Sequence, residues 1–177
     1  NYGAGTATLA RLAFGRAAWE TPMQDEIDAI REFETFMCDR FPVAARWTRG
    51  ITREVQRTGQ ASSVGGFIRT GISRADARRV GVNHVVQASG ADVLRAILQT
   101  LDRDLGVSGR VILPMHDGLL VEAADDKVSF VVEIVRQAMR DATLKFLPGT
   151  IPIEMLIGWR DKRGKAATWN KRPARFD

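Results

Sequence analysis

Hydrophobic residues in the first part of the chain recur every three or four positions, which is the spacing of one face of an α-helix. The clearest example follows Thr21-Pro22, where Thr21 can cap a helix, Pro22 suits its first turn and acidic residues gather near its start. This pattern predicts a helix that ends at Phe41-Pro42. Five apolar residues are expected to form its buried face: Ile27, Ile30, Phe33, Phe36 and Met37.

The segments on either side of this helix also have residue patterns that predict their secondary structure. Residues 7–19 predict a short helix, and residues 42–57 predict another. Residues 58–73 are rich in Gly, Ser and Thr, which indicates a loop with a short hairpin around Gly65-Gly66.

The rest of the chain mixes helices with strands. Residues 75–105 predict a long helical stretch, and residues 128–146 predict a helix with Val131, Val132, Val135 and Met139 on one face. Three apolar, β-branched runs predict strands, at 107–115, 119–123 and 151–157. The tail after Gly158 is basic and is expected to be irregular. The predicted fold class is therefore α+β, with helices first and then a small antiparallel sheet with packed helices.

Composition limits the class of protein. The 177 residues are enough for one domain with a real core. No apolar stretch is long enough to cross a membrane, and the first residues lack the basic and apolar regions of a signal peptide. The single cysteine, Cys38, cannot form an internal disulfide or a Cys-based zinc site, and it suits a reducing cytoplasm. Because there is no initiator methionine, we expect the chain to begin in the middle of a longer protein or to be an expression fragment.

The net charge of +5 is unevenly distributed. Residues 20–39 carry seven acidic residues and one basic residue, whereas residues 40–80 carry nine arginines and two acidic residues. Residues 158–177 carry seven basic and two acidic residues. A stripe of arginines is typical of a protein that binds a polyphosphate such as nucleic acid. Solvated helix faces also collect arginine, so the charge pattern alone leaves both interpretations open.

The sharpest local feature is Met115-His116-Asp117-Gly118, which lies between two apolar runs. Asp-Gly between such runs predicts a tight hairpin turn, because the turn needs a positive φ that Gly118 can supply. Asp117 is then either a turn-forming residue or a rigidly held, partly exposed carboxylate. Carboxylate oxygens are the ligands that magnesium prefers, so Asp117 is a candidate metal ligand.

A second feature is the run Asn83-His84-Val85-Val86-Gln87-Ala88-Ser89-Gly90-Ala91-Asp92. Asn83 and Gln87 are four residues apart, so they lie on one face of a helix, and amides can read the edges of bases. The small residues that follow allow another backbone to approach closely. The alternative is a tight helix contact with two solvated amides.

Together with Asn1-Tyr2-Gly3, these motifs resemble those of the family A (DNA polymerase I-like) DNA polymerases. That family has Asn-Phe/Tyr-Gly at the end of its fingers helix, then Arg with Asn-x-x-x-Gln followed by small residues and Ala-Asp, then a palm hairpin with His-Asp-Glu at its tip. The order and spacing match here over nearly the whole chain. The resemblance implies that residues 1–57 are the C-terminal part of the fingers with connecting helices, and residues 58–177 the C-terminal part of the palm.

The resemblance also implies an enzyme, which transfers a deoxynucleotide from dNTP to a primer 3′-hydroxyl with two Mg²⁺ ions. Asp117 would be one of the two palm aspartates that bind these ions, and His116 would lie beside it near the primer end. The partners would be primer–template DNA, dNTP and an upstream polymerase segment with the other catalytic aspartate. The location would be the cytoplasm of a bacterial or phage-infected cell, with no membrane partner.

Four further residues acquire expected roles from the resemblance. Asn83 and Gln87 would contact DNA on the minor-groove side near the new base pair, where acceptors occupy similar positions in all base pairs. Arg79 would hold template or primer, and Tyr2 would stack near the sugar and base of the incoming nucleotide.

Three departures from the family pattern matter. Gly118 stands where the family usually has Glu, and Thr6 stands where many members have a second Tyr. The Asp-x-Ser-x-x-Glu-like motif with the other metal-binding aspartate does not occur in this sequence, nor do the triphosphate-binding Arg and Lys that precede Asn1 in the family. We therefore expect this fragment to be inactive alone. The alternatives are a single-subunit RNA polymerase, or a polymerase-like protein that binds DNA without catalysis.

Overall fold

The computed structural model describes residues 5–149 and residue 158. Tyr2, the predicted strand at 151–157 and the basic tail beyond Gly158 lie outside the described residues. The chain forms two compact units, Asn1–Leu94 and Arg95–Asp177, and the division falls within one long helix. The predicted boundary between fingers and palm, at 57/58, divides the chain at a different place and stays a prediction.

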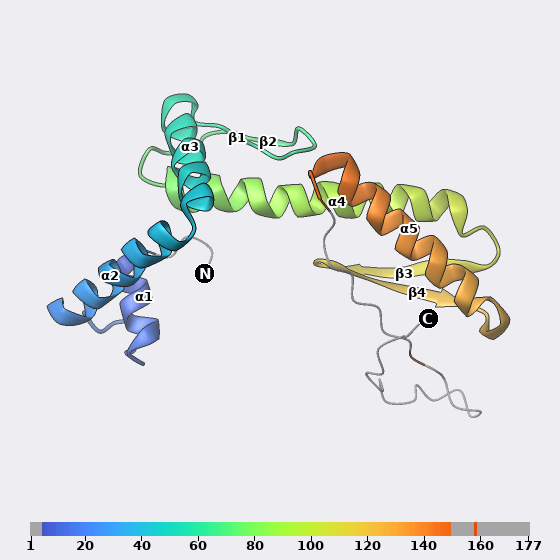
Figure 1. Cartoon of the computed structure of the whole chain (residues 1–177), viewed down its shortest axis with the longest axis horizontal. Helices are drawn as coiled ribbons and strands as arrows, with labels where there is room; N and C mark the ends of the chain where they lie inside the picture. The colour runs from blue at the N-terminus through green and yellow to red at the C-terminus, as the bar shows by residue number, and fades with distance from the viewer. Residues whose placement is uncertain (1–4, 150–157, 159–177) are drawn as a thin grey trace. The chain divides into compact units, whose positions relative to one another are not determined.

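The first unit is mainly helical (Figure 1). It contains α1 (Thr6–Ala13), α2 (Gln24–Arg40), α3 (Pro42–Thr58) and a small hairpin of β1 (Ala61–Ser62) and β2 (Ile68–Arg69). The π-helix η1 (Ala77–Gly81) then leads directly into α4 (Val82–Asp104). Pro42 at the first position of α3 ends one helix and begins the next, as predicted, because proline has no N–H to donate within α2.

Two predicted helix boundaries are wrong. The helix predicted at 7–19 ends at Ala13, because Gly15 adopts a left-handed φ of 67° that closes it. The next helix begins at Gln24 rather than at Thr21-Pro22. The Glu26 carboxylate accepts a hydrogen bond from the Met23 N–H at 2.8 Å, so this backbone donor at the helix start does not need Thr21 as its partner.

Glu26 also joins the segment after α1 to α2. Both of its carboxylate oxygens accept from Arg16 Nε, at 2.8 and 2.6 Å, and its side chain is only 8% exposed. The hydrogen bond from Arg16 lowers the pKa of the Glu26 carboxyl. The residue that caps the start of α2 is thus itself held by Arg16, ten residues earlier, and helical periodicity does not reveal this pair.

The predicted buried face of α2 is also wrong. Ile27 and Ile30 are half-buried, and Phe33, Phe36 and Met37 are exposed, with 60% of Phe36 accessible. Glu26 is instead the buried residue of this helix. The spacing correctly indicates one apolar face, but in the described part of the chain its second half, at Phe33, Phe36 and Met37, stays exposed.

The core of the first unit lies between α3 and η1. It is formed by residues from α3, β1, the segment after β2, η1 and the start of α4: Val55, Ala61, Ile72, Ala77 and Val85. A Cβ on Gly81 would lie 2.8 Å from Val55 Cγ2, so this glycine allows the π-helix to pack directly against α3.

The β1–β2 hairpin is held against α4 by its backbone (Figure 1). Ser89 Oγ accepts the Val64 N–H at 3.0 Å, and Asp92 Oδ2 accepts the Gly65 N–H at 2.8 Å. A Cβ on Gly65 would lie 2.4 Å from Asp92 Cγ. The small residues of α4 thus allow a close backbone approach, as the sequence indicated.

Gly65→Ala should destabilise the protein by about 1–3 kcal/mol, because the added methyl group overlaps the Asp92 carboxylate. Denaturant unfolding measures the change. Gly50→Ala is the matched control, since a Cβ at this position in α3 meets nothing within 4 Å and alanine favours helix by up to about 1 kcal/mol. Equal stability of the Gly65→Ala variant and the wild type would contradict this docking geometry.

The second unit contains the last part of α4, the antiparallel hairpin of β3 (Gly109–Met115) and β4 (Gly118–Ala123), a 3₁₀ turn η2 (Asp125–Lys127) and α5 (Val128–Phe146). An irregularity between Val111 and Leu113 shifts the strand register. The α5 face predicted from the sequence is confirmed, with Val131, Val132 and Val135 buried and Met139 half-buried. The α+β fold class is confirmed.

Candidate active site

The turn between β3 and β4 consists of His116 and Asp117, because Met115 pairs with Gly118 across the hairpin. The positive φ of this turn belongs to His116, at 47°, and not to Gly118 as predicted. A Cβ on Gly118 would lie 3.6 Å from the Met115 carbonyl oxygen, which is an ordinary contact. The turn therefore does not require glycine at 118. Instead it places a non-glycine residue in a conformation that is uncommon outside functional sites and turns.

Asp117 lies exposed at the tip of this hairpin. No residue in the described part of the chain donates a hydrogen bond to its carboxylate or forms an ion pair with it. Both oxygens are thus available to a ligand from outside the chain. The nearby pair of Arg110 with Glu122, at 2.7 Å, bridges the two strands further along the hairpin and stabilises their pairing.

Asp117 stands apart from other metal-binding side chains. Across residues 5–149, no three His, Cys, Asp or Glu side chains group closely enough to hold a metal ion. An exposed carboxylate at a hairpin tip can serve as one metal ligand. A complete metal site would need further ligands.

Arg79, Asn83 and Gln87 lie in the first unit, along η1 and α4. Arg79 is exposed and donates to Asp76 Oδ1 at 2.8 Å. Hydrogen bonds from Arg79 and then from Ser73 lower the pKa of the Asp76 carboxyl, so Asp76 remains charged and holds the arginine in place.

The amides of Asn83 and Gln87 are half-buried and one helical turn apart. Asn83 Oδ1 is buried and has no hydrogen-bond partner among the described residues. An unsatisfied buried acceptor costs about 1–3 kcal/mol, and such atoms in native structures often await a ligand or water. The neighbouring His84 instead contacts the hairpin, with its Nε2 at 3.3 Å from the Phe67 carbonyl oxygen.

Sequence reasoning missed the π-helical geometry of η1. A π-helix has wider turns than an α-helix, so the four-residue spacing rule does not apply between Arg79 and Asn83. Single π-turns occur frequently at functional sites, and this one contains Arg79. The tight packing of Gly81 on Val55 accompanies it, but no pattern in the sequence indicates a π-turn.

The family model for DNA polymerase family A matches residues 12–162. The chain belongs to DNA polymerase family A. The resemblance drawn from the three sequence motifs is therefore confirmed. Family A membership also accounts for the order of the features, with the Arg79 to Gln87 segment ahead of the His116-Asp117 hairpin.

Relatives of this family A chain include DNA polymerase I of Treponema pallidum, 27% identical over 165 residues that cover 85% of this chain and 16% of the relative. DNA polymerase I of Pseudomonas aeruginosa is 26% identical over 166 residues, which cover 84% of this chain and 18% of the relative. The chain thus spans less than a fifth of the length of these relatives.

Among solved structures, the chain is similar to the POL domain of Pol1 from M. smegmatis in complex with DNA primer-template and dNTP. The TM-score is 0.60 at 25% sequence identity, and the match covers 77% of this chain and 26% of that one. The likeness supports the polymerase fold for this family A chain. In the described part of the chain, no helix combines the length and the apolar character needed to span a bilayer.

Proposed function

We propose that the protein containing this chain is a DNA-directed DNA polymerase that transfers nucleotides from dNTP to a primer 3′-hydroxyl on a template. The observation that carries this proposal is the exposed, unpaired carboxylate of Asp117 at the tip of the β3–β4 hairpin, in a chain that belongs to DNA polymerase family A. The relatives named DNA polymerase I support the same activity.

Asp117 would supply one carboxylate to a magnesium site, because its two oxygens have no partner in the described chain and hard divalent cations prefer such ligands. Two Mg²⁺ ions, when bound, would supply the activation of the attacking 3′-hydroxyl and the stabilisation of the leaving pyrophosphate. We assign the second carboxylate to an upstream segment. His116 precedes Asp117 in the turn and has a positive φ of 47°. In the proposed enzyme it would lie beside Asp117 near the primer end.

Arg79, Asn83 and Gln87 would hold the primer–template. The ion pair with Asp76 would hold Arg79 where it can bind a phosphate. The amides can check base-pair geometry in the minor groove, where acceptors occupy similar places in every pair. Tyr2, outside the described residues, would contact the sugar of the incoming dNTP. Primer–template DNA and dNTP are also the ligands named for the similar Pol1 domain.

In this proposal residues 1–57 belong to the fingers and residues 58–177 to the palm. The enzyme would work in the cytoplasm of a bacterial or phage-infected cell, which agrees with its bacterial relatives. A polymerase-like protein without catalysis remains a second candidate, because Gly118 replaces the usual carboxylate although the turn has room for a side chain.

Primer extension by the full-length protein, supplied with Mg²⁺, tests the choice of substrate. We expect deoxynucleotides to extend a DNA primer much faster than ribonucleotides. A preference for ribonucleotides would assign the protein to the RNA polymerases instead, and the absence of extension with either would favour the non-catalytic candidate.

A further inference from the structure

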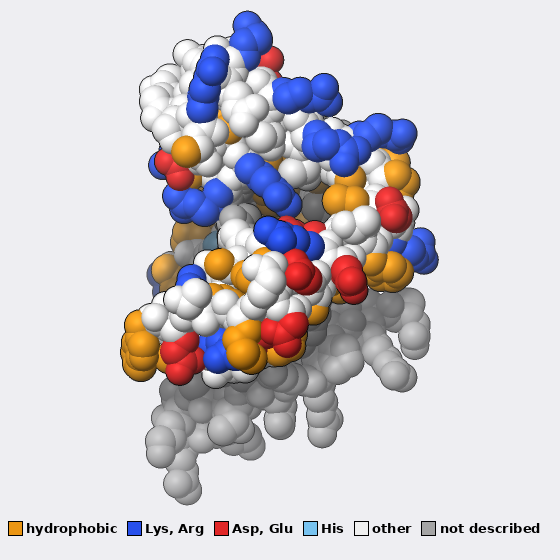
Figure 2. Space-filling view, turned by 90° about the vertical axis from the view of Figure 1, so that its left-hand side faces the viewer, with side chains coloured by type: hydrophobic (Ala, Val, Ile, Leu, Met, Phe, Trp, Pro, Cys, Tyr) orange, Lys and Arg blue, Asp and Glu red, His pale blue; other side chains and the backbone are white. Residues whose placement is uncertain are grey.

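The last two turns of α3 form one wall of a concavity of about 420 Å³ in the first unit. Arg53, Gln56 and Arg57 line it from α3, and Arg74 lines it from the segment after β2. Among the described residues, no acidic side chain lines it. Figure 2 shows basic side chains gathered over the upper part of the molecular face, where Figure 1 places α3.

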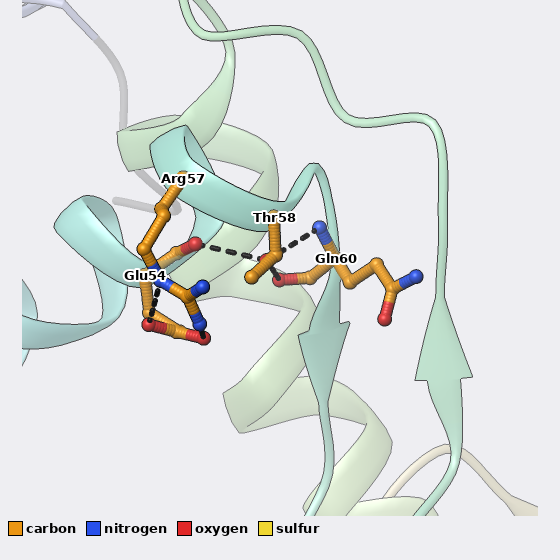
Figure 3. Close-up of polar contacts among 4 residues, drawn as sticks. All are labelled: Glu54, Arg57, Thr58 and Gln60. Carbon is orange, nitrogen blue, oxygen red and sulfur yellow. Dashed lines mark hydrogen bonds and ion pairs between the residues drawn. The ribbon is translucent and has the colours of Figure 1, made fainter.

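The end of α3 is fixed by a set of short-range bonds (Figure 3). Thr58 Oγ1 donates to the Glu54 carbonyl at 2.9 Å and accepts the Gln60 N–H at 3.1 Å. Gly59 caps the helix in the left-handed conformation, with its N–H on the Val55 carbonyl at 2.8 Å. The wall of the concavity therefore has a defined geometry before any ligand arrives.

Arg53 and Arg74 each make one longer contact with a backbone carbonyl. Arg53 Nε donates to the Arg49 carbonyl at 3.4 Å, and Arg74 Nε donates to the Gln56 carbonyl at 3.3 Å. In each case the bond uses Nε alone and leaves the two terminal amino groups without a partner among the described residues. Two parallel N–H groups on a planar guanidinium match two oxygens of a phosphate.

The charges of these arginines are not equivalent. Arg57 donates to both carboxylate oxygens of Glu54, and this hydrogen bonding lowers the pKa of the Glu54 carboxyl, so the pair carries no net charge (Figure 3). Arg53 and Arg74 form no ion pair with any described carboxylate, so their two positive charges are uncompensated. A concavity with two uncompensated arginines and a side-chain amide is complementary to an anion.

Helix stabilisation explains only part of this arrangement. Basic residues near a helix C-terminus interact favourably with its dipole, and Arg74 satisfies a carbonyl that α3 leaves without an intrahelical partner. These two roles do not explain why arginines from two different segments line the same concavity. They also do not explain why the terminal amino groups of both arginines are unpaired.

We propose that Arg53, Gln56 and Arg74 form a binding site for backbone phosphates of the DNA substrate. The proposal rests on the proposed polymerase function for the identity of the ligand. Contacts of this kind position a strand without reading its sequence, and each neutralised phosphate releases counterions. The site should therefore contribute to affinity for DNA of any sequence, and its contribution should decrease with salt.

Fluorescence anisotropy with labelled primer–template DNA, at several salt concentrations, tests the site in the full-length protein. Each phosphate contact contributes about 0.9 to the slope of log affinity against log salt, so Arg53→Gln/Arg74→Gln should reduce the slope by about 2 and weaken binding at all sequences. Arg53→Lys/Arg74→Lys should retain most of the slope. Arg31→Gln/Arg103→Gln is the matched control, because it removes the same charge from two exposed arginines that pair with Asp28 and Asp104.

Further measurements separate the site from stability and from the nucleotide. Arg53→Gln alone leaves the Arg74 contact to α3 intact and should reduce the slope by about 1, with an unchanged melting temperature. At low salt and saturating DNA, the double variant should still extend primers with an unchanged KM for dNTP. The proposal would be overturned if the double variant had the same slope of log affinity against log salt as the control variant. It would also be overturned if the double variant had a raised KM for dNTP with unchanged DNA affinity. If the wild-type protein does not extend primers at all, the proposed function itself is overturned.

Discussion

Asp117→Asn in the full-length protein is expected to reduce the rate of nucleotide addition by about 1000-fold or more. The substitution keeps the size of the side chain and the hairpin turn but replaces a charged oxygen ligand with a neutral amide. Stabilisation by a bound metal ion is worth several kcal/mol, and each 1.36 kcal/mol corresponds to a factor of ten in rate. Single-turnover primer extension at saturating DNA and dNTP measures the effect. DNA affinity should remain close to that of the wild type.

Asp125→Asn provides the matched control, because Asp125 is also an exposed aspartate of the second unit and lies in η2 rather than at the hairpin tip. This variant should extend primers at the wild-type rate. If Asp117→Asn also extends primers at a near-normal rate, Asp117 is a turn residue and not a metal ligand.

Tyr2→Phe is expected to make the enzyme reject dideoxynucleotides by roughly tenfold to a hundredfold relative to the wild type. In the family the residue at this position is either Phe or Tyr. With Tyr2, the phenolic hydroxyl can fill the space beside the 3′ position of the incoming sugar and donate a hydrogen bond there. With Phe, the 3′-hydroxyl of the nucleotide itself must do so, and a dideoxynucleotide lacks it. A hydrogen bond lost in a closed site is worth about 1–3 kcal/mol.

Competition between dideoxynucleotides and deoxynucleotides in one extension reaction measures this selectivity directly. Incorporation of the normal deoxynucleotides serves as the internal control, and both proteins should perform it at similar rates. Equal dideoxy incorporation by the wild type and by Tyr2→Phe would mean that Tyr2 only packs against its neighbours.

Local patterns were sufficient to predict most elements of the fold. The 128–146 helix, the break at Phe41-Pro42 and the hairpin around Gly65-Gly66 agree with the structure because short-range chemistry determines them. The start of α2 was missed because Glu26 caps the backbone at Met23, and Glu26 is also held by Arg16, ten residues earlier. Burial of Phe33 and Phe36 was wrong because periodicity cannot show whether another element covers a face.

For the candidate site, the sequence predicted the position of Asp117 in the fold but not the backbone geometry around the site residues. The position of Asp117 at a hairpin tip was predicted, whereas the positive φ was assigned to Gly118 and belongs to His116. The π-turn that contains Arg79 has no recognisable sequence pattern. The pairing of Arg53 and Arg74 in one concavity depends on the return of the chain after the β1–β2 hairpin, and charge counts alone could not predict it.

Copying of a DNA template is the activity that we propose for the protein containing this family A chain. Single-nucleotide incorporation by the full-length protein, on four primer–templates that differ only in the templating base, tests it most directly. We expect each template to direct addition of its complementary deoxynucleotide in the presence of Mg²⁺, and we expect a chelator to stop the reaction. Tight DNA binding without incorporation on any of the four templates, or incorporation that ignores the templating base, would contradict it.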